Sequence, residues 1–544
     1  DPVPQITYKV GEIVFRKSIV LVKDIDEVLI KFELLQAPAK AVLQLKPFLA
    51  FRNIHALTHQ NSDARTAHGE AKNGLSFRMY EPFPDLFLQF NKKGVKFVDT
   101  PCWYNNITYI DEYRRGFDCM EDQFVPGYFE TSMKPGDSII FSASKLECDP
   151  AGFKKVFDAE VKDMGTVESM HEQLLRCADL LICNHNNKKR ITAGYSWMYT
   201  GLLRETLYAL PGLTLFGKKD PAEFEEILDN LIADEEERLF HRTTQVEAPL
   251  YLASVLQYYI EFGADPKKVW KKYGNVVKRI ITSYEPGIRK EVAMHPNGLL
   301  WAQMDGVALS WMNAYLNGRP VTERAGYQVE TNAFWYNSIC FALEMEGKYG
   351  PKDSGFTARW TAIRDLVKAN YQKMFWNQEH GCLADYVDNN GQNRDVRPNQ
   401  LYAIWVKNSP VDEELAPSII RVIDNELLTA RGIRTLSPRD VKYKGVYEGT
   451  QLERDMAYHQ GCTRPFLLDP YVDVCFRIKG ASFWKKAEWL CEGFYEDLGK
   501  HGVGAFSELY DGDPPHEPHG AISSALSTAG LLAVEYFLEK YKQI

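Results

Sequence analysis

The pattern of apolar residues changes near residue 148, and this change limits the folds open to the chain more than any other feature. Before it, short segments such as 28–34 and 86–90 alternate imperfectly between apolar and polar residues, as half-buried strands do. Turn signals, such as Lys-Pro-Gly-Asp at 134–137, stand between them. From about residue 191, apolar residues recur at helical spacing almost to the end. We therefore expect a strand-rich part followed by a helical part.

These patterns predict a multidomain chain. Residues 1–147 are typical of an antiparallel β-sandwich, 148–190 of a region with a linker helix over 156–183, and 191–544 of an all-helical domain. A length of 544 residues fits two cores better than one. The clearest helical segments are 203–210, 221–236, 247–263, 266–284, 329–346, 355–376, 399–407, 411–427, 456–462, 481–497 and 521–541.

Composition narrows the classes of partner. The formal net charge is -9, whereas nucleic acids and anionic membranes require a basic face, so we expect neither of them and favour a neutral substrate. No apolar run approaches the roughly 18 residues of a membrane span. The ten cysteines have no paired spacing and are expected to be reduced, which suits the cytoplasm. The sequence contains no phosphate-binding loop and no nucleophile elbow, so we expect no cofactor and no other enzyme class. The oligomeric state stays open.

The segment 504–520 concentrates polar side chains near the C-terminus. Its three prolines and three glycines predict an irregular, shaped loop, which carries four carboxylates, two histidines and two aromatic residues. Polar loops in front of packed helices often carry the chemistry of a protein, and an acidic surface turn is the alternative interpretation. His516 and His519 are three positions apart, but Pro515 and Pro518 oppose the helix that a zinc site of this kind needs, so no metal is expected.

The segment 507–518, Ser-Glu-Leu-Tyr-Asp-Gly-Asp-Pro-Pro-His-Glu-Pro, resembles the general-base loop of the glycogen debranching enzyme C-terminal family, the amylo-α-1,6-glucosidases. Residues 47–52 and 125–129 resemble the N-terminal domain of the same family, so the resemblance covers essentially the whole chain. It implies an (α/α)6 toroid for the helical domain. It also implies hydrolysis of a terminal α-1,6-linked glucose with inversion, with Glu508 as the base that activates water. Family members have further sandwich strands upstream of the position of Asp1, so we expect this chain to lack its first strands.

The general-acid position departs from this family. Residues 298–314 are similar to a family pattern that ends Thr-Trp-Met-Asp-Ala, but Asn313 stands where that Asp is the proposed acid. An amide has no proton to deliver at a usable pH. Asp305 lies eight positions away, which is about 12 Å if the segment is helical and too far to serve the same bond. Glu323 and Glu330 follow, but neither matches the acid position.

Three further positions depart from the family within its motifs. Glu205 and Glu247 stand where the family prefers Asp, and one extra methylene moves a carboxylate by about 1.5 Å. Glu247 is alternatively a carboxylate that stabilises a helix N-terminus. Arg464 replaces a Trp in the segment 457–465, so a stacking platform is lost or exchanged for a cation.

Residues in the other matching motifs are expected to bind the sugar. Trp197 is alternatively a core residue, and Asn399 and Gln400 alternatively cap a helix. The expected substrate-binding residues are Trp197, Arg204, Glu205, Glu247, Trp311, Glu330, Asn332, Trp335, Asn399, Gln400, Tyr458, His459, Gln460, Asp511 and His516.

The favoured interpretation is a glycoside hydrolase acting on an α-glucan or oligosaccharide, with Glu508 as base and Asn313 in the acid position. The alternative is a catalytically impaired glucan-binding homologue without hydrolase activity. An enzyme that recruits another acid stays open, as does an acid-to-amide variant made to trap a ligand, although such a variant does not explain Glu205, Glu247 and Arg464. A phosphorylase is disfavoured, because it needs no base to activate water.

Overall fold

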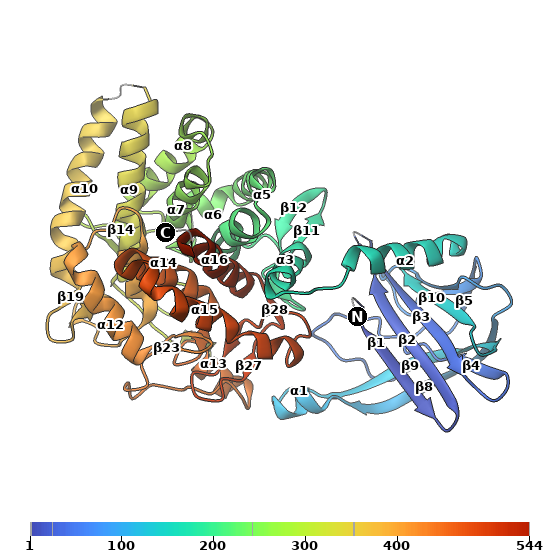
Figure 1. Ribbon diagram of the computed structural model, residues 1–544. Helices are drawn as coiled ribbons and strands as arrows, with labels where there is room; N and C mark the ends of the chain where they lie inside the picture. Colours follow the sequence, from blue (N-terminus) through green and yellow to red (C-terminus); the bar gives the residue numbers. More distant parts are fainter. Residues whose placement is uncertain (1–2, 24, 242, 352–353, 543–544) are drawn as a thin grey trace. The chain divides into compact units, whose positions relative to one another are not determined.

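The computed structural model of the protein describes residues 3–23, 25–241, 243–351 and 354–542. The chain divides into two compact units, Asp1–Glu168 and Ser169–Ile544 (Figure 1). All ten cysteines are free. Within the described ranges, no helix has the length and apolar character that a membrane crossing requires.

Two antiparallel sheets form the first unit, which confirms the antiparallel strands predicted before residue 147. Neighbouring strands of the larger sheet are, in order, β1 (Gln5–Val10), β2 (Ile13–Leu21), β3 (Glu27–Gln36), β10 (Ser138–Ser144), β7 (Leu86–Phe90), β6 (Gly74–Phe77) and β5 (His68–Ala71). The smaller sheet has the order β4 (Ala41–Leu45), β9 (Met120–Met133) and β8 (Lys96–Thr108). A short helix, α1 (Ile110–Arg114), follows β8.

One apolar core is shared by the two sheets. Phe90 of the larger sheet and Phe129 of the smaller one belong to the same buried cluster, and their ring centroids are 5.0 Å apart. Successive residues of a strand point to opposite faces of the sheet. Leu29 of β3 faces away from the core that the two sheets share and is buried on the other face of the larger sheet. There it packs with Phe153 and Phe157 of α2 (Phe153–Met164). The larger sheet is therefore covered on both faces.

The single linker helix predicted over 156–183 is two helices. Gly165, with φ of 55°, ends α2, because a residue in the left-handed region cannot continue the helix. Ser169 begins α3 (Met170–Leu181) by accepting the backbone N–H of Glu172 at 3.2 Å. The boundary between the two compact units falls between these helices. After α3 the chain forms the hairpin β11 (Ile182–His185) and β12 (Lys188–Ile191).

Helices dominate the second unit, as predicted. The predicted helices at 203–210 and 266–284 are confirmed as α4 (Leu203–Leu210) and α8 (Pro266–Tyr284). The other helices of this unit that follow α3 are α5 (Pro221–Asp234), α6 (Glu236–Phe240), α7 (Ala248–Glu261), α9 (Val329–Tyr349), α10 (Ser354–Phe375), α11 (Leu401–Trp405), α12 (Ala416–Glu426), α13 (Gln451–Ala457), α14 (Leu468–Lys479), α15 (Trp484–Glu492) and α16 (Ala525–Lys542).

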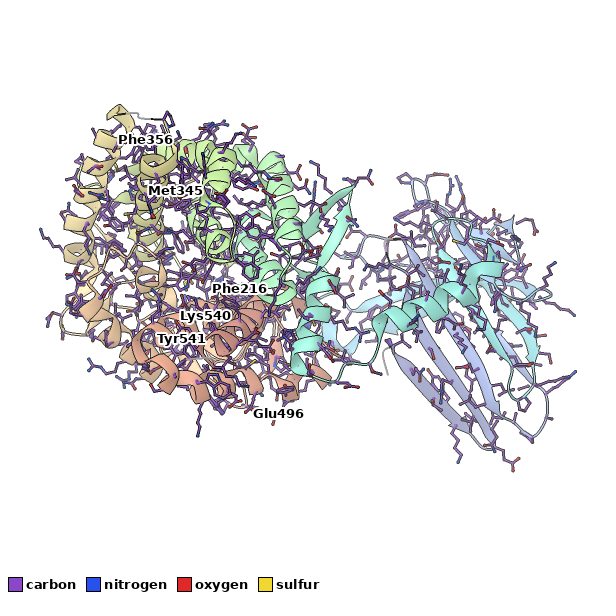
Figure 2. The ribbon with its side chains drawn as sticks, turned by 45° about the horizontal axis from the view of Figure 1, so that its top comes forward. Phe216, Met345, Phe356, Glu496, Lys540 and Tyr541 are labelled. Carbon is purple, nitrogen blue, oxygen red and sulfur yellow. The ribbon has the colours of Figure 1, made fainter. Side chains whose placement is uncertain are left out.

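The segment Pro211–Lys218 extends α4 as a π-helix and packs against α16. A Cβ atom at Gly212 would lie 2.5 Å from the carbonyl oxygen of Ala529, so only glycine allows this approach. Phe216, which Figure 2 labels, belongs to the same segment. Its ring stacks on that of Tyr536 of α16, with ring centroids 4.5 Å apart. One apolar cluster runs through these helices with the exception of α13, whose buried Ala457 belongs to a separate small cluster with Cys462 and Leu509.

The expectation of an all-helical second unit is wrong in its loops. Five short antiparallel strands form one sheet there, in the order β23 (Leu428–Thr429), β24 (Gly432–Arg434), β25 (Thr463–Arg464), β26 (Leu509–Tyr510) and β27 (Pro518–His519). Segment 504–520 therefore contains two strands, although its prolines and glycines predicted none. Pro518 is tolerated because β27 is the edge strand, where a missing N–H breaks no pairing.

One helix assignment also fails, and so does one conditional helical distance. The helix predicted at 456–462 is α13, which ends at Ala457, and Gly461, at φ of 153°, lies in a conformation that no helix has. Residues 298–314 are not helical either. They form β15 (Leu300–Ala302) and then a loop, so the helical estimate of the distance between Asp305 and position 313 does not apply.

Candidate active site

Glu508 immediately precedes β26 and is 8% exposed. Its Oε1 accepts hydrogen bonds from the hydroxyl of Tyr458 and from Nη1 of Arg464, the latter at 2.8 Å. Its Oε2 accepts the backbone N–H of Ala521 at 3.0 Å. Donors from separate segments of the chain therefore fix the two oxygens of one buried carboxylate.

Short strands bring these donors together. β26 pairs with β25, so Arg464 lies on the strand beside the one that follows Glu508. The backbone N–H of Glu508 donates to the carbonyl of Ala521 at 3.0 Å, which closes the loop on itself. Gly520, at φ of 73°, lies against the carboxylate, because a Cβ atom there would stand 2.5 Å from Oε2. The backbone itself thus packs around Glu508.

Arg464 is a buried cation that stacks on an aromatic ring. The residue is 5% exposed, and its guanidinium carbon lies 4.1 Å from the ring centroid of Tyr458. Its Nη2 donates to the backbone carbonyl of Tyr458 at 3.2 Å. Burial raises the pKa of Tyr458, and the charge of Glu508 raises it further. The hydroxyl therefore stays protonated and acts as a donor to the carboxylate.

His459 lies between the rings of Trp311 and Tyr458. Its ring centroid is 5.4 Å from that of Trp311 and 4.6 Å from that of Tyr458, both edge to face. Burial lowers the pKa of His459 well below its usual value, and the guanidinium groups of Arg464 and Arg397 lower it further. The imidazole is therefore neutral at physiological pH, and it can accept as well as donate a hydrogen bond.

Asn313 lies on the loop that Trp311 anchors. The indole N–H of Trp311 donates to Oδ1 of Asn399 at 2.7 Å inside the unit. Two residues further on, the backbone N–H of Asn313 donates to the carbonyl of Trp311 at 3.0 Å, and the Asn313 side chain is exposed. Position 313 is thus reachable by a ligand, and the amide on it has no acidic proton.

Arg204 and Glu247 form a second buried ion pair. Nε of Arg204 lies 2.5 Å from Oε1 of Glu247, and the exposed fractions of the two residues are 5% and 0%. Glu247 stands at the N-cap position of α7, where its side chain makes no capping bond to any described residue. Its carboxylate therefore serves the ion pair rather than the helix end.

Several buried polar atoms near these residues have no hydrogen-bond partner in the described part of the chain. They are Oε2 of Glu205, Oη of Tyr208, Oε2 of Glu247, Nδ1 of His459 and Nε of Arg464. Aromatic contacts link them, because the ring of Phe466 lies 6.3 Å from that of Tyr208 and 5.6 Å from that of Trp311. Unpaired donors and acceptors beside aromatic rings are what a neutral, hydroxyl-rich ligand satisfies.

A buried charge network lies behind the loop of Trp311. Arg324 donates from Nη2 to Oε2 of Glu330 at 2.6 Å and from Nε to Oδ2 of Asp385 at 2.7 Å. Asp385 in turn accepts from Nδ2 of Asn399 at 2.7 Å. Sequence reasoning missed Arg324 and Asp385, since no local pattern joins two residues 61 positions apart. Glu330 is fully paired and 0% exposed, so this network supports Asn399 and hence Trp311.

Other expected substrate-binding residues are used by the protein itself. Asn332 bonds the backbone N–H and carbonyl of Leu300, at 2.7 and 3.0 Å. Trp335 is fully buried and donates to the carbonyl of Gly298 at 3.0 Å. These two side chains therefore fasten the segment around β15 to α9 and do not face a ligand.

Gln400 and Gln460 also bond protein groups. Gln400 accepts the backbone N–H of Leu383 at 3.1 Å. Gln460 accepts from Arg397 at 2.8 Å and donates to the Thr322 hydroxyl at 3.0 Å. Both side chains thus hold the loops that surround the site.

The three remaining expected residues are Trp197, Asp511 and His516. Trp197 is 40% exposed, which excludes core packing. Oδ1 of Asp511 accepts the backbone N–H of Tyr447 at 2.7 Å, and Nδ1 of His516 lies 2.8 Å from the Asp511 carbonyl oxygen. Asp511 and His516 therefore shape the loop of Glu508. No three His, Cys, Asp or Glu side chains gather as a metal site in the described ranges.

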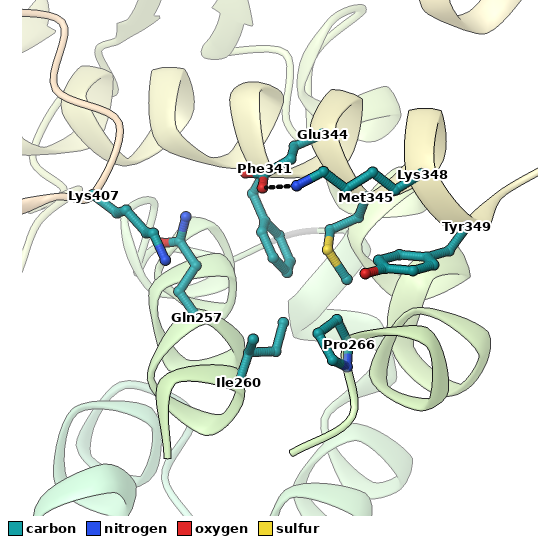
Figure 3. Close-up of a pocket in the computed structure, with 9 residues that line it drawn as sticks. All are labelled: Gln257, Ile260, Pro266, Phe341, Glu344, Met345, Lys348, Tyr349 and Lys407. Carbon is teal, nitrogen blue, oxygen red and sulfur yellow. Dashed lines mark hydrogen bonds and ion pairs between the residues drawn. The ribbon is translucent and has the colours of Figure 1, made fainter. Parts of the chain in front are cut away.

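A cavity of about 190 Å³ lies elsewhere, between α7 and α9 (Figure 3). Ile260, Phe341 and Met345 line it on the apolar side. Lys348 and Glu344 on its rim pair with each other at 2.8 Å. None of its lining residues is an expected substrate-binding residue.

Two family models match this chain. Residues 174–533 match the family described as Amylo-alpha-1,6-glucosidase, and residues 1–140 match the one described as Glycogen debranching enzyme N terminal. The Glycogen debranching enzyme of Saccharomyces cerevisiae (strain ATCC 204508 / S288c) is 25% identical over 235 residues. That alignment covers 36% of this chain and 15% of the yeast protein, so the chain matches only a small part of that relative.

One solved structure is similar over nearly the whole chain. It is a bacterial glucoamylase complexed with acarbose, with a TM-score of 0.60 and 12% sequence identity. The likeness covers 98% of this chain and 82% of the glucoamylase chain. At this identity it bears on the fold alone.

Proposed function

The chain belongs to the amylo-alpha-1,6-glucosidase family, and on that premise we propose that it is a glycoside hydrolase acting on glycogen-like branched glucans. The proposed reaction removes a terminal α-1,6-linked glucose with inversion at the anomeric carbon. We propose in addition that residues 191–544 form an (α/α)6 toroid, joined through the region 148–190 to a β-sandwich at 1–147. The likeness to the glucoamylase fold supports the toroid.

One observation carries the proposal: Glu508 is a buried carboxylate whose oxygens are held by Tyr458, Arg464 and the backbone of Ala521. An inverting hydrolase needs a fixed carboxylate to take a proton from the attacking water. In the proposed reaction, the water oxygen attacks the anomeric carbon while one water proton passes to Glu508. The electron pair of the broken C–O bond goes to the leaving oxygen, which must then gain a proton.

Asn313 limits the second half of this reaction. It occupies the position of the general acid and cannot protonate the leaving oxygen. Loss of general-acid catalysis lowers a rate by about 10²- to 10⁴-fold. We therefore propose that the chain cleaves substrates that need this proton slowly, and substrates with a good leaving group much faster.

The proposed ligand is a neutral sugar. Four arginines near the site are paired with carboxylates, as Arg204 is with Glu247 and Arg464 with Glu508, so none of these four is a free cation for an anionic sugar. The unpaired atoms of Tyr208 and His459 offer hydrogen bonds to hydroxyl groups, and Trp311 offers a ring edge and an apolar surface. A neutral ligand also agrees with the net charge of -9.

A second candidate is a glucan-binding protein without hydrolase activity. Asn313 favours it, because the acid is missing while the frame around Glu508 is complete. The two candidates share the ligand and differ in the reaction.

α-Glucosyl fluoride separates the two candidates, since fluoride leaves without a proton. We expect the protein to hydrolyse the fluoride, the Glu508→Gln variant to lose this activity by at least about 10²-fold, and a branched limit dextrin to react slowly with either. If the fluoride is inert while calorimetry detects binding of the dextrin, the protein binds glucans and is not a hydrolase. Rapid dextrin cleavage by the unmodified protein contradicts the role given to position 313.

A further inference from the structure

We propose that Arg464 is a positioning residue that holds Oε1 of Glu508 and thereby assigns Oε2 to the hydrolytic water. This inference rests on the proposed hydrolase function and names a residue that the resemblance to the family does not supply. It concerns orientation of the carboxylate, because Arg464 contacts Glu508 and no reacting atom.

The two oxygens of Glu508 differ in how many donors they accept. Oε1 accepts from the hydroxyl of Tyr458 and from Nη1 of Arg464, which uses both of its lone pairs. Oε2 accepts only the backbone N–H of Ala521 among the described residues, at 3.0 Å. One lone pair is therefore left on Oε2, and this is where an O–H group of water can donate.

Arg464 is held on several sides, so it can fix the carboxylate in turn. Its guanidinium lies over the ring of Tyr458 at 4.1 Å and donates to the backbone carbonyl of the same residue. Its strand, β25, is the central strand of the five-stranded sheet and pairs with β24 and β26. The residue is 5% exposed. Arg464 thus connects Tyr458 and Glu508 into one rigid unit.

The reaction with α-glucosyl fluoride shows what this orientation contributes. The water oxygen bonds to the anomeric carbon, the C–F bond breaks, and its electron pair leaves as fluoride. The water proton passes to Oε2 of Glu508 and later to solvent. A carboxylate that can rotate presents Oε2 in the correct direction for only part of the time, and misplacement by about 1 Å costs on the order of 10²-fold in rate.

The test compares Arg464→Leu and Arg464→Lys in steady-state hydrolysis of α-glucosyl fluoride. We expect Arg464→Leu to lower kcat by at least about tenfold, with KM changed by less than about threefold, because orientation acts on the reaction rather than on binding. Lys keeps one donor for Oε1 but lacks the planar stack on Tyr458. Arg464→Lys should therefore recover part of the lost kcat.

Arg431→Leu is the matched control. Arg431 is also a buried arginine beside the same sheet, but Nε of Arg431 pairs with Asp497 at 2.7 Å instead of Glu508. Removing it is expected to lower the melting temperature and to leave kcat within about twofold. Melting temperatures of all variants are measured first, and Arg464→Lys decides the question if Arg464→Leu does not fold.

The possible outcomes are distinct. If the unmodified protein hydrolyses the fluoride and both Arg464 variants keep its kcat, Arg464 does not position Glu508, although the hydrolase function stands. If Arg431→Leu loses as much kcat as Arg464→Leu, the effect belongs to the sheet as a whole and the inference is wrong. If the unmodified protein does not hydrolyse the fluoride at all, the proposed function fails and the inference fails with it.

Discussion

Nε of Arg204 and Oε1 of Glu247 form a buried ion pair 2.5 Å long. The pair joins α4 to α7, so it fixes the relative position of two helices that contribute to the candidate site. The second carboxylate oxygen of Glu247 has no partner among the described residues. Glu247 therefore has one oxygen bonded to Arg204 and one buried acceptor without a partner in the described ranges.

Breaking this pair on one side should destabilise the second unit. Arg204→Met leaves an unpaired buried carboxylate, and we expect a loss of about 3–5 kcal/mol in the free energy of unfolding, measured in urea. The double variant Arg204→Met with Glu247→Leu removes both charges and should recover most of this loss. Equal instability of the single and double variants would show that the pair does not carry the effect.

The close approach at Gly520 gives a second prediction. Gly520→Ala places a methyl group against Oε2 of Glu508 and requires φ of 73°, so it should displace the carboxylate. We expect kcat on α-glucosyl fluoride to fall by at least about tenfold. Gly318→Ala is the control, since Gly318 has φ of 76° but no atom within 4 Å of an added Cβ. If both variants behave alike, backbone strain and not contact with Glu508 explains the loss.

The pKa of His459 predicts a dependence of stability on pH. Because burial lowers this pKa below its value in the unfolded chain, the unfolded chain binds more protons as the pH falls below about 6.5. Stability contributed by the neutral histidine is therefore present above that pH and lost below it. The free energy of unfolding should fall by about 1.4 kcal/mol more in the unmodified protein than in His459→Gln between about pH 7.5 and 5.5.

Other titrating groups cancel in this comparison. Burial raises the pKa of Asp469, which has the opposite effect on stability, but both proteins carry it. Denaturant titrations at the two pH values measure the difference. An equal fall in both proteins contradicts the neutral, buried state of His459.

Sequence reasoning succeeded where a local pattern determines structure. The helix at 266–284 follows from apolar residues at helical spacing after Asp265 and Pro266, which cap and start α8. It failed where contacts between segments that are distant in the sequence determine the structure. The strands β25 and β26 are two residues long and exist because they pair with each other, and no local signal predicts them.

The same limit applies to the site. Motif resemblance indicated Glu508 and Tyr458 as site residues and Arg464 only as a departure from the motif. It did not indicate that the three side chains contact one another, because the contacts join positions 44 and 50 residues apart. The resemblance also predicts ligand contacts for residues that are buried. Trp335 lies in a matching motif, yet its indole N–H bonds a backbone carbonyl inside the protein. A motif shows which residues are grouped, and only the packing shows which of them reach a ligand.

The measurement that tests the account most directly is hydrolysis of a branched limit dextrin by Asn313→Asp. The loop of Trp311 holds position 313 at an exposed place. On the proposed assignment, the new carboxyl group supplies the proton that the leaving oxygen needs. We predict a gain of about 10²- to 10⁴-fold in kcat on the dextrin, with hydrolysis of α-glucosyl fluoride nearly unchanged. No gain on the dextrin, in a variant that still hydrolyses the fluoride, would contradict the assignment of position 313 as the general-acid position.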